Sequence, residues 1–188
     1  TGNAVAATAS TQAQAYAGVP YSNEVTMLFS EIDPALHAAV AGGTYGTASG
    51  PTSTFDYQPK YFLINGQPYA AGSAPLAVLP AGEKTLLRFL NAGLQTHVPM
   101  INGKYLQMIA EDGNPYPWPD NPREQYSVLL PPAKTIDAVI TPAAGSYPLY
   151  DRRLNLVNAA SQIGGRLAIL EVPGGGTNTA PAITSTAI

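Results

Sequence analysis

Two histidines are the first residues of this sequence that could do chemistry. His37 and His97 are sixty positions apart, and neither belongs to a His-x-His pair. The chain has no cysteine, so no thiolate is available as a nucleophile or as a metal ligand. We expect neither histidine to bind a metal. His37, beside Glu31 and Asp33, is predicted to be a surface side chain. His97 is predicted to begin a strand, either hydrogen-bonded to a carbonyl or facing a neighbouring domain.

Two groups of charged residues could support acid–base chemistry or anion binding. Glu111 and Asp112 are adjacent at the end of an expected strand, where neighbouring side chains point in opposite directions. We therefore expect turn chemistry at Asp112-Gly113 and not a catalytic carboxylate pair. The run Asp151-Arg152-Arg153 is the densest charge cluster, and it favours a structural ion pair or an interdomain contact over an anion site. No catalytic residue is predicted.

A proline-stiffened loop over residues 113–126, GNPYPWPDNPREQY, carries Tyr116 and the only tryptophan, Trp118. Such a loop could stack on a sugar or line a substrate cleft. We favour an interface with another domain, because exposed aromatic side chains on stiff loops make contact surfaces at low entropic cost. Tyr116 and Trp118 are the predicted interface residues.

The composition limits the classes of partner. Charged residues make up 11% of the 188 residues, against about 25% in an average soluble domain. A surface so poor in charge is typical of secreted proteins and of domains covered by neighbours. The net charge of −3 provides no basic patch for nucleic acid. No apolar run approaches the ~20 residues of a membrane helix, and the first residues lack the features of a signal peptide.

The elements that must position these residues lie in one body. Residues 1–19, rich in Ala, Thr and Gln, are predicted to be a linker, residues 20–173 one domain, and residues 174–188 a second linker. Within the domain, short apolar runs bounded by turn residues predict about nine strands, which is typical of a β-sandwich with Greek-key connections. Asn65-Gly66, Asn102-Gly103 and Asp112-Gly113 are predicted hairpin-type turns. The expected strands are 24–30, 61–64, 76–79, 85–91, 98–101, 105–111, 126–130, 135–141, 146–151 and 166–172, with a helical or turn-like patch at 31–40.

Four segments follow one another in an order that resembles a known family. They are YFLINGQPY (61–69), TLLRFLNAG (85–93) continued by HVPMING and YLQMIAEDG, SVLLPPAKTIDAVITP (127–142), and GSYPLYDRRLNLVNA with GGRLAILEV (145–172). Together they resemble the cupredoxin domains of multicopper oxidases over residues 24–172. The resemblance implies an all-β, cupredoxin-like Greek-key sandwich.

The resemblance also implies a parent enzyme that couples one-electron oxidation of a substrate to the reduction of oxygen. In such enzymes the first and last of three domains carry copper, and the middle domain is metal-free. The present sequence reads His97-Val98-Pro99 where a copper domain could have His-x-His, and zero cysteines exclude a blue-copper centre. We therefore expect the middle, structural domain of an exported multicopper oxidase. Its partners would be the other cupredoxin domains of the same chain, copper would reside in those domains, and this segment alone would be inactive.

A second interpretation is a non-catalytic carbohydrate-binding or adhesion β-sandwich of a large exported protein. The aromatic loop favours it, as does the segment NTAPAIT (178–184), which resembles the start of an immunoglobulin-like repeat. A stand-alone hydrolase is a third interpretation, although no GxSxG-type elbow is present.

Overall fold

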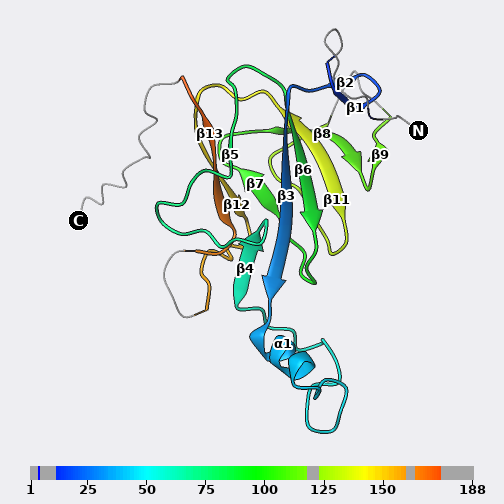
Figure 1. The fold of residues 1–188 in the computed structure, drawn as a ribbon. Coiled ribbons are helices and arrows are strands. Elements are labelled where there is room, and N and C mark those ends of the chain that lie inside the picture. Colours follow the sequence, from blue (N-terminus) through cyan, green and yellow to red (C-terminus); the bar gives the residue numbers. More distant parts are fainter. Residues whose placement is uncertain (1–3, 5–11, 118–122, 160–163, 175–188) are drawn as a thin grey trace, which may run out of the picture.

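The computed structural model describes residues 4, 12–117, 123–159 and 164–174, which form two packed β-sheets and a small hairpin (Figure 1). The all-β prediction is confirmed. The elements in chain order are β1 (Gln14–Tyr16), β2 (Val19–Pro20), β3 (Asn23–Ile32), α1 (Pro34–Ala41), β4 (Tyr61–Ile64), β5 (Ala77–Val78), β6 (Thr85–Asn91), β7 (Pro99–Ile101), β8 (Leu106–Glu111), β9 (Asn114–Pro115), β10 (Arg123–Gln125), β11 (Thr135–Ile140), β12 (Gly145–Asp151) and β13 (Leu167–Val172).

The larger sheet has the strand order β10-β8-β11-β6-β3-β4, and β9 pairs with β8. Strands β3 and β6 run parallel, with Met27 beside Phe89, and the other neighbours in this sheet are antiparallel. The smaller sheet has the order β5-β13-β12-β7, in which only β5 and β13 are parallel. The parallel neighbours are joined by long connections, as parallel pairing requires.

The core lies between the two sheets and follows the alternation of the strands. In β3 the residues Val25, Met27 and Phe29 are buried, as their spacing predicts. Leu149 of β12 and Leu170 of β13 meet them from the smaller sheet, within the same cluster of buried side chains. Burial of this apolar surface is the main favourable term in folding.

A second apolar cluster lies on the outer face of the larger sheet, beneath the β1–β2 hairpin. Ala15 and Tyr16 are buried there against Leu86, Ala110 and Val139. The predicted linker over residues 1–19 thus includes a segment that packs on the sheet. Its composition is poor in strand-forming residues, and the sheet beneath it supplies the apolar contacts that its own sequence does not signal.

The connection between β3 and β4 projects from the end of the sandwich that is opposite the β1–β2 hairpin (Figure 1). It contains α1, whose first turn is capped by the Asp33 carboxylate, which accepts hydrogen bonds from the amides of Ala35 and Leu36. Pro34 at the first helical position suits this start. His37 is exposed on α1, as expected. No helix in the described ranges has the length and apolar character to cross a membrane.

The predicted turns differ in what they connect. Asn65-Gly66 and Asp112-Gly113 have positive φ at both positions and close the two-residue hairpins β4–Gln67 and β8–β9, as predicted. Asn102-Gly103 connects β7 of the smaller sheet with β8 of the larger one, so it is a crossover between sheets and not a hairpin. The expected strand 126–130 is replaced by β10, immediately before it, and by a bridge between His97 and Leu130.

Candidate functional site

A buried cluster of four ionisable side chains joins the two sheets. Glu31 lies near the end of β3, and His97 lies between β6 and β7. Asp151 ends β12, and Arg166 immediately precedes β13. All four side chains are completely buried. The cluster connects the larger sheet, through Glu31, with the smaller sheet, through Asp151.

The imidazole of His97 lies between the two carboxylates. Its Nε2 is 3.1 Å from Oε2 of Glu31, and its Nδ1 is 3.3 Å from Oδ2 of Asp151. The second contact has the distance of an ion pair but not the angle of a hydrogen bond. The ring also packs against Phe29, with 6.0 Å between the ring centroids. His97 was expected to be hydrogen-bonded to a carbonyl or to face a neighbouring domain. The backbone of His97 does pair with Leu130, but its side chain is buried and binds carboxylates.

The guanidinium of Arg166 bridges the same two carboxylates from another side. Nη2 donates to Oε2 of Glu31 at 2.7 Å, and Nη1 donates to Oδ2 of Asp151 at 3.1 Å. Its central carbon lies over the ring of Phe62, 4.7 Å from the ring centroid. Two carboxylates thus face one guanidinium and one imidazole.

Backbone amides donate further hydrogen bonds to both carboxylates. Oε1 of Glu31 accepts hydrogen bonds from the amides of Leu94 (2.6 Å) and Gln95 (2.9 Å). Oδ1 of Asp151 accepts from the amides of Val98 and Arg153, both at 3.0 Å. The segment 94–98 therefore wraps around the cluster and is fixed by it.

The buried cluster explains why the turn Asn91-Ala92-Gly93 ends in a glycine. A Cβ atom at this position would overlap both carboxylate oxygens of Glu31. The φ angle of Gly93 is not in the left-handed region, so the requirement for glycine is steric. The side chain of the preceding Asn91 spans the same turn, since its Nδ2 donates to the carbonyls of Gln95 and Leu130.

The pKa values of the two carboxyls reflect a balance between burial and binding. Burial raises the pKa of Glu31, but hydrogen bonds from His97 and from the two amides, together with the charge of Arg166, hold that pKa below its ordinary value. Burial acts on Asp151 in the same way, and there His97 and the amides lower the pKa to about 2. Burial lowers the pKa of Arg166, and the two carboxylates oppose that effect.

This arrangement is suited to holding the fold together. None of the four side chains is accessible to a substrate, and each charged group is already bound by partners. Removing one partner of such a cluster costs about 3–5 kcal/mol, because an uncompensated buried charge remains.

The other charged residues that the sequence singles out have structural partners. Both carboxylates of Glu111 and Asp112 contact Nζ of Lys134, at 2.5 and 2.6 Å. They were expected to point in opposite directions; the positive φ of Asp112 turns its side chain back toward the same lysine. The contact lies at the surface, where such pairs contribute little.

The ion pair predicted for Asp151-Arg152-Arg153 exists, but the partner of Asp151 is the distant Arg166. Arg153 donates instead to the carbonyl of Thr96, and Arg152 is exposed. Of the two predicted interface residues, Tyr116 is partly buried against the core, and its hydroxyl donates to Oε2 of Glu111 at 3.2 Å. Trp118 lies outside the described residues.

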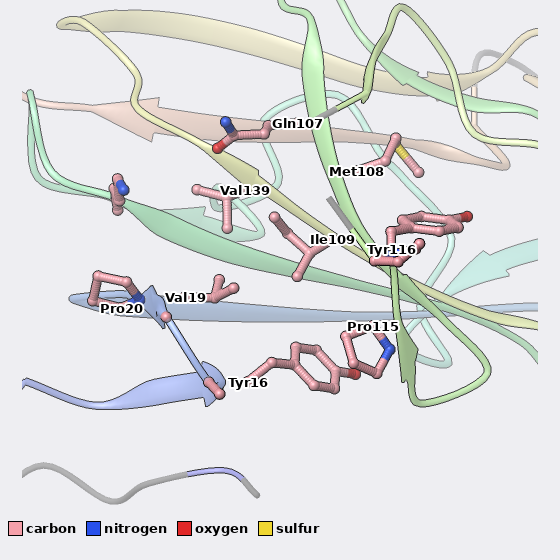
Figure 2. A pocket seen from close by; sticks show the side chains of 13 residues that line it. Tyr16, Val19, Pro20, Gln107, Met108, Ile109, Pro115, Tyr116 and Val139 are labelled. Atoms are coloured by element: carbon pink, nitrogen blue, oxygen red, sulfur yellow. The ribbon is translucent and has the colours of Figure 1, made fainter. Parts of the chain in front are cut away.

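A surface cavity lies between the β1–β2 hairpin and the β8–β9 hairpin (Figure 2). Tyr16 and Tyr116 border it, with Ile109 of β8 between them, and its volume is about 350 Å³. The sequence did not indicate this cavity or the buried cluster, because both depend on contacts between residues far apart in the chain. The sequence analysis singled out His97 and Asp151 one by one but did not predict that they belong to one cluster.

The chain matches known proteins by sequence family and by fold. A family model described as multicopper oxidase matches residues 35–174, well over half of the chain. No curated protein sequence matches it.

Several solved structures share its fold. The blue copper oxidase from Nitrosomonas europaea is 19% identical with a TM-score of 0.63, and the match covers 81% of this chain and 44% of that one. The multicopper oxidase mgLAC is 20% identical with a TM-score of 0.65, covering 86% and 47%. A copper-containing nitrite reductase from Thermus scotoductus SA-01 is 19% identical with a TM-score of 0.57, covering 86% and 34%.

The chain spans less than half the length of these structures. At such identities they establish the fold, and the predicted cupredoxin-like β-sandwich is confirmed. Because the family model covers most of the sequence, the chain belongs to the multicopper oxidase family.

Proposed function

We propose that this chain is a copper-free structural domain of a multicopper oxidase, the middle one where three are present. The parent would couple one-electron oxidation of a substrate to oxygen reduction at copper centres in its other domains. The observation that carries the proposal is the position of His97, whose two ring nitrogens both face buried carboxylates. An imidazole bound in this way has no nitrogen directed at a metal ion.

The donor set of the chain does not fit copper. A blue-copper centre uses two histidines and a cysteine thiolate, and this sequence has no cysteine. Its other histidine, His37, is exposed on α1, at a distance of sixty residues in the sequence. In place of a metal, the buried ion cluster holds the loop 94–98 and the ends of both sheets.

The partners would be other cupredoxin domains of the same parent. The matched structures are more than twice as long as the region they share with this chain. The low content of charged residues suits a surface that neighbours cover, as do exposed apolar side chains such as Phe55, Tyr105 and Leu129. An exported location, periplasmic or extracellular, belongs to the same proposal and agrees with the charge-poor composition.

Measuring copper binding by the purified chain tests the proposal that this domain is copper-free. After incubation with excess Cu²⁺ and extensive dialysis, we expect far less than one copper per chain by elemental analysis. We also expect no blue absorption band and no oxidation of a phenolic dye. His37→Ala serves as the matched variant, because any copper held only by the exposed histidine would disappear with it. A stoichiometric copper that survives dialysis in both proteins would overturn the proposal.

The proposal that the loop carrying Trp118 contacts another domain is tested in the parent oxidase. Trp118→Ala should leave the unfolding free energy of the isolated domain nearly unchanged and should weaken the assembly or the activity of the parent. Unfolding of the isolated domain by Trp118→Ala would show that Trp118 belongs to a core and not to an interface.

A further inference from the structure

The cavity between the β1–β2 and β8–β9 hairpins has the size and the lining of a small-molecule site (Figure 2). Its volume of about 350 Å³ lies within the range of about 300–1,000 Å³ typical of ligand pockets. Val19, Ile109 and Val139 supply apolar walls, and the lining residues come from five different strands, β1, β2, β8, β9 and β11. The cavity lies on the outer face of the larger sheet, outside the buried ion cluster.

Two tyrosine rings border this cavity, and each is fixed by its hydroxyl. The hydroxyl of Tyr16 donates to Oδ2 of Asp137 at 2.6 Å. The hydroxyl of Tyr116 donates to Oε2 of Glu111 at 3.2 Å. Because these bonds hold the polar ends of both rings, the rings are already oriented, and a ligand that packs on them loses little additional side-chain entropy.

The polar groups at the cavity favour a negative charge on the ligand. Lys84 and Gln107 are the lining residues with polar side-chain ends that remain available: in the described ranges no hydrogen bond or ion pair engages the Lys84 ammonium or the Gln107 amide. The nearby carboxylates are already bound, Glu111 by Lys134 and Asp137 by Tyr16. An anionic group at the cavity would therefore meet a free cation and a free amide donor.

We propose that this cavity binds a small aromatic carboxylate, with its ring between Tyr16 and Tyr116 and its carboxylate toward Lys84. A planar ring matches the apolar and aromatic walls, and a single carboxylate matches the ammonium group of Lys84, the one such group among the described residues that line the cavity. The assignment does not depend on the proposed role of the chain in a multicopper oxidase.

The test uses the full 188-residue chain labelled with ¹⁵N and two probes of similar size, benzoate and neutral benzyl alcohol. We expect benzoate to shift the amide resonances of Gln107 and Ile109 in a saturable titration, and to bind more tightly than benzyl alcohol. Lys84→Met, which removes the charge and keeps the chain length, should weaken benzoate about threefold or more, as for a partly exposed ion pair, and leave benzyl alcohol unchanged. Lys60→Met is the matched control and should have no effect, because Lys60 immediately precedes β4, whose first residues lie near the opposite end of the sandwich (Figure 1).

A second variant tests the place of binding. Val19→Trp puts a large side chain at the cavity wall and should abolish binding of both probes while the remaining spectrum stays folded. Equal affinities for benzoate and benzyl alcohol, or equal effects of Lys84→Met and Lys60→Met, would overturn the carboxylate assignment. Failure of both probes to shift Gln107 and Ile109 at millimolar concentration would overturn the site. So would an oligosaccharide that shifts the same amides more strongly, which would point to the carbohydrate-binding function instead.

Discussion

The carboxylate of Glu31 and the guanidinium of Arg166 lie 2.7 Å apart, fully buried, although 135 positions separate them in the sequence. Glu31 belongs to strand β3 of the larger sheet, and Arg166 immediately precedes strand β13 of the smaller sheet. This contact, with its counterpart at Asp151, joins the two sheets at one end of the sandwich. In a sandwich held mainly by apolar packing, it fixes one relative position of the sheets by directional bonds.

Arg166→Met should destabilise the chain by about 3–5 kcal/mol, because two buried carboxylates lose their permanent counter-charge. Urea unfolding followed by fluorescence gives the free energy of unfolding. Arg152→Met is the matched control, since Arg152 is exposed, and its effect should stay within about 0.5 kcal/mol. Equal midpoints for the two variants would show that the buried ion pair does not support the fold.

The stability of the chain should fall with acidity. The pKa values of Glu31 and Asp151 are lower in the folded state than their ordinary values, that of Asp151 being about 2. The folded state therefore binds fewer protons than the unfolded state, and the stabilisation is complete above the ordinary carboxyl pKa of about 4. It is lost as the pH falls from there toward 2.

Urea midpoints measured between pH 5 and pH 2.5 check this dependence. Glu31→Gln should be less stable at pH 7, and its stability should fall less steeply with acid than that of the unmodified chain. Glu111→Gln, at a surface ion pair, should change the slope much less. A flat profile for the unmodified chain would contradict the prediction.

Gly93→Ala should destabilise the chain by about 1–3 kcal/mol, the usual cost of overpacking, because the new Cβ overlaps the carboxylate of Glu31. Gly42→Ala provides the comparison, since the nearest atom to its Cβ would be 3.1 Å away. A double-mutant cycle identifies the cause: in a Glu31→Ala background the cost of Gly93→Ala should shrink. An unchanged cost would place the strain elsewhere.

The sequence predicted the features that depend on local patterns. The alternation of Val25, Met27 and Phe29 identified a core-facing strand, and the dipeptides Asn65-Gly66 and Asp112-Gly113 identified two hairpin turns. Strand alternation and hairpin turns both depend on backbone geometry within a few residues.

The buried ion cluster could not be predicted from local sequence patterns. His97 was noticed as a lone histidine, but its two carboxylate partners, Glu31 and Asp151, come from two other parts of the chain, and only the fold brings them together. Neither Glu31 nor Arg166 has an oppositely charged immediate neighbour in its own segment that would predict a buried ion pair. The need for glycine at position 93 likewise depends on a carboxylate that lies 62 positions earlier in the sequence.

The β1–β2 hairpin was missed for a related reason, and its attachment can be tested. Tyr16 reaches from the hairpin to Asp137 of β11, and burial together with that hydrogen bond raises the pKa of its hydroxyl. Tyr16→Phe should cost about 1 kcal/mol of stability, because it removes one buried hydrogen bond and leaves the ring in place. Tyr16→Ala should cost more, since it also removes the ring that packs on Leu86 and Val139.

Hydrogen exchange distinguishes local from global effects of these changes. We expect Tyr16→Ala to speed the exchange of the amide of Tyr21, which binds the carbonyl of Ala13, while amides of β11 and β6 stay protected. Tyr57→Phe is the control, as its hydroxyl binds the carbonyl of Glu31 near the other end of the molecule. If Tyr16→Ala left exchange at Tyr21 as slow as in the unmodified chain, the hairpin would be held by contacts other than those of Tyr16.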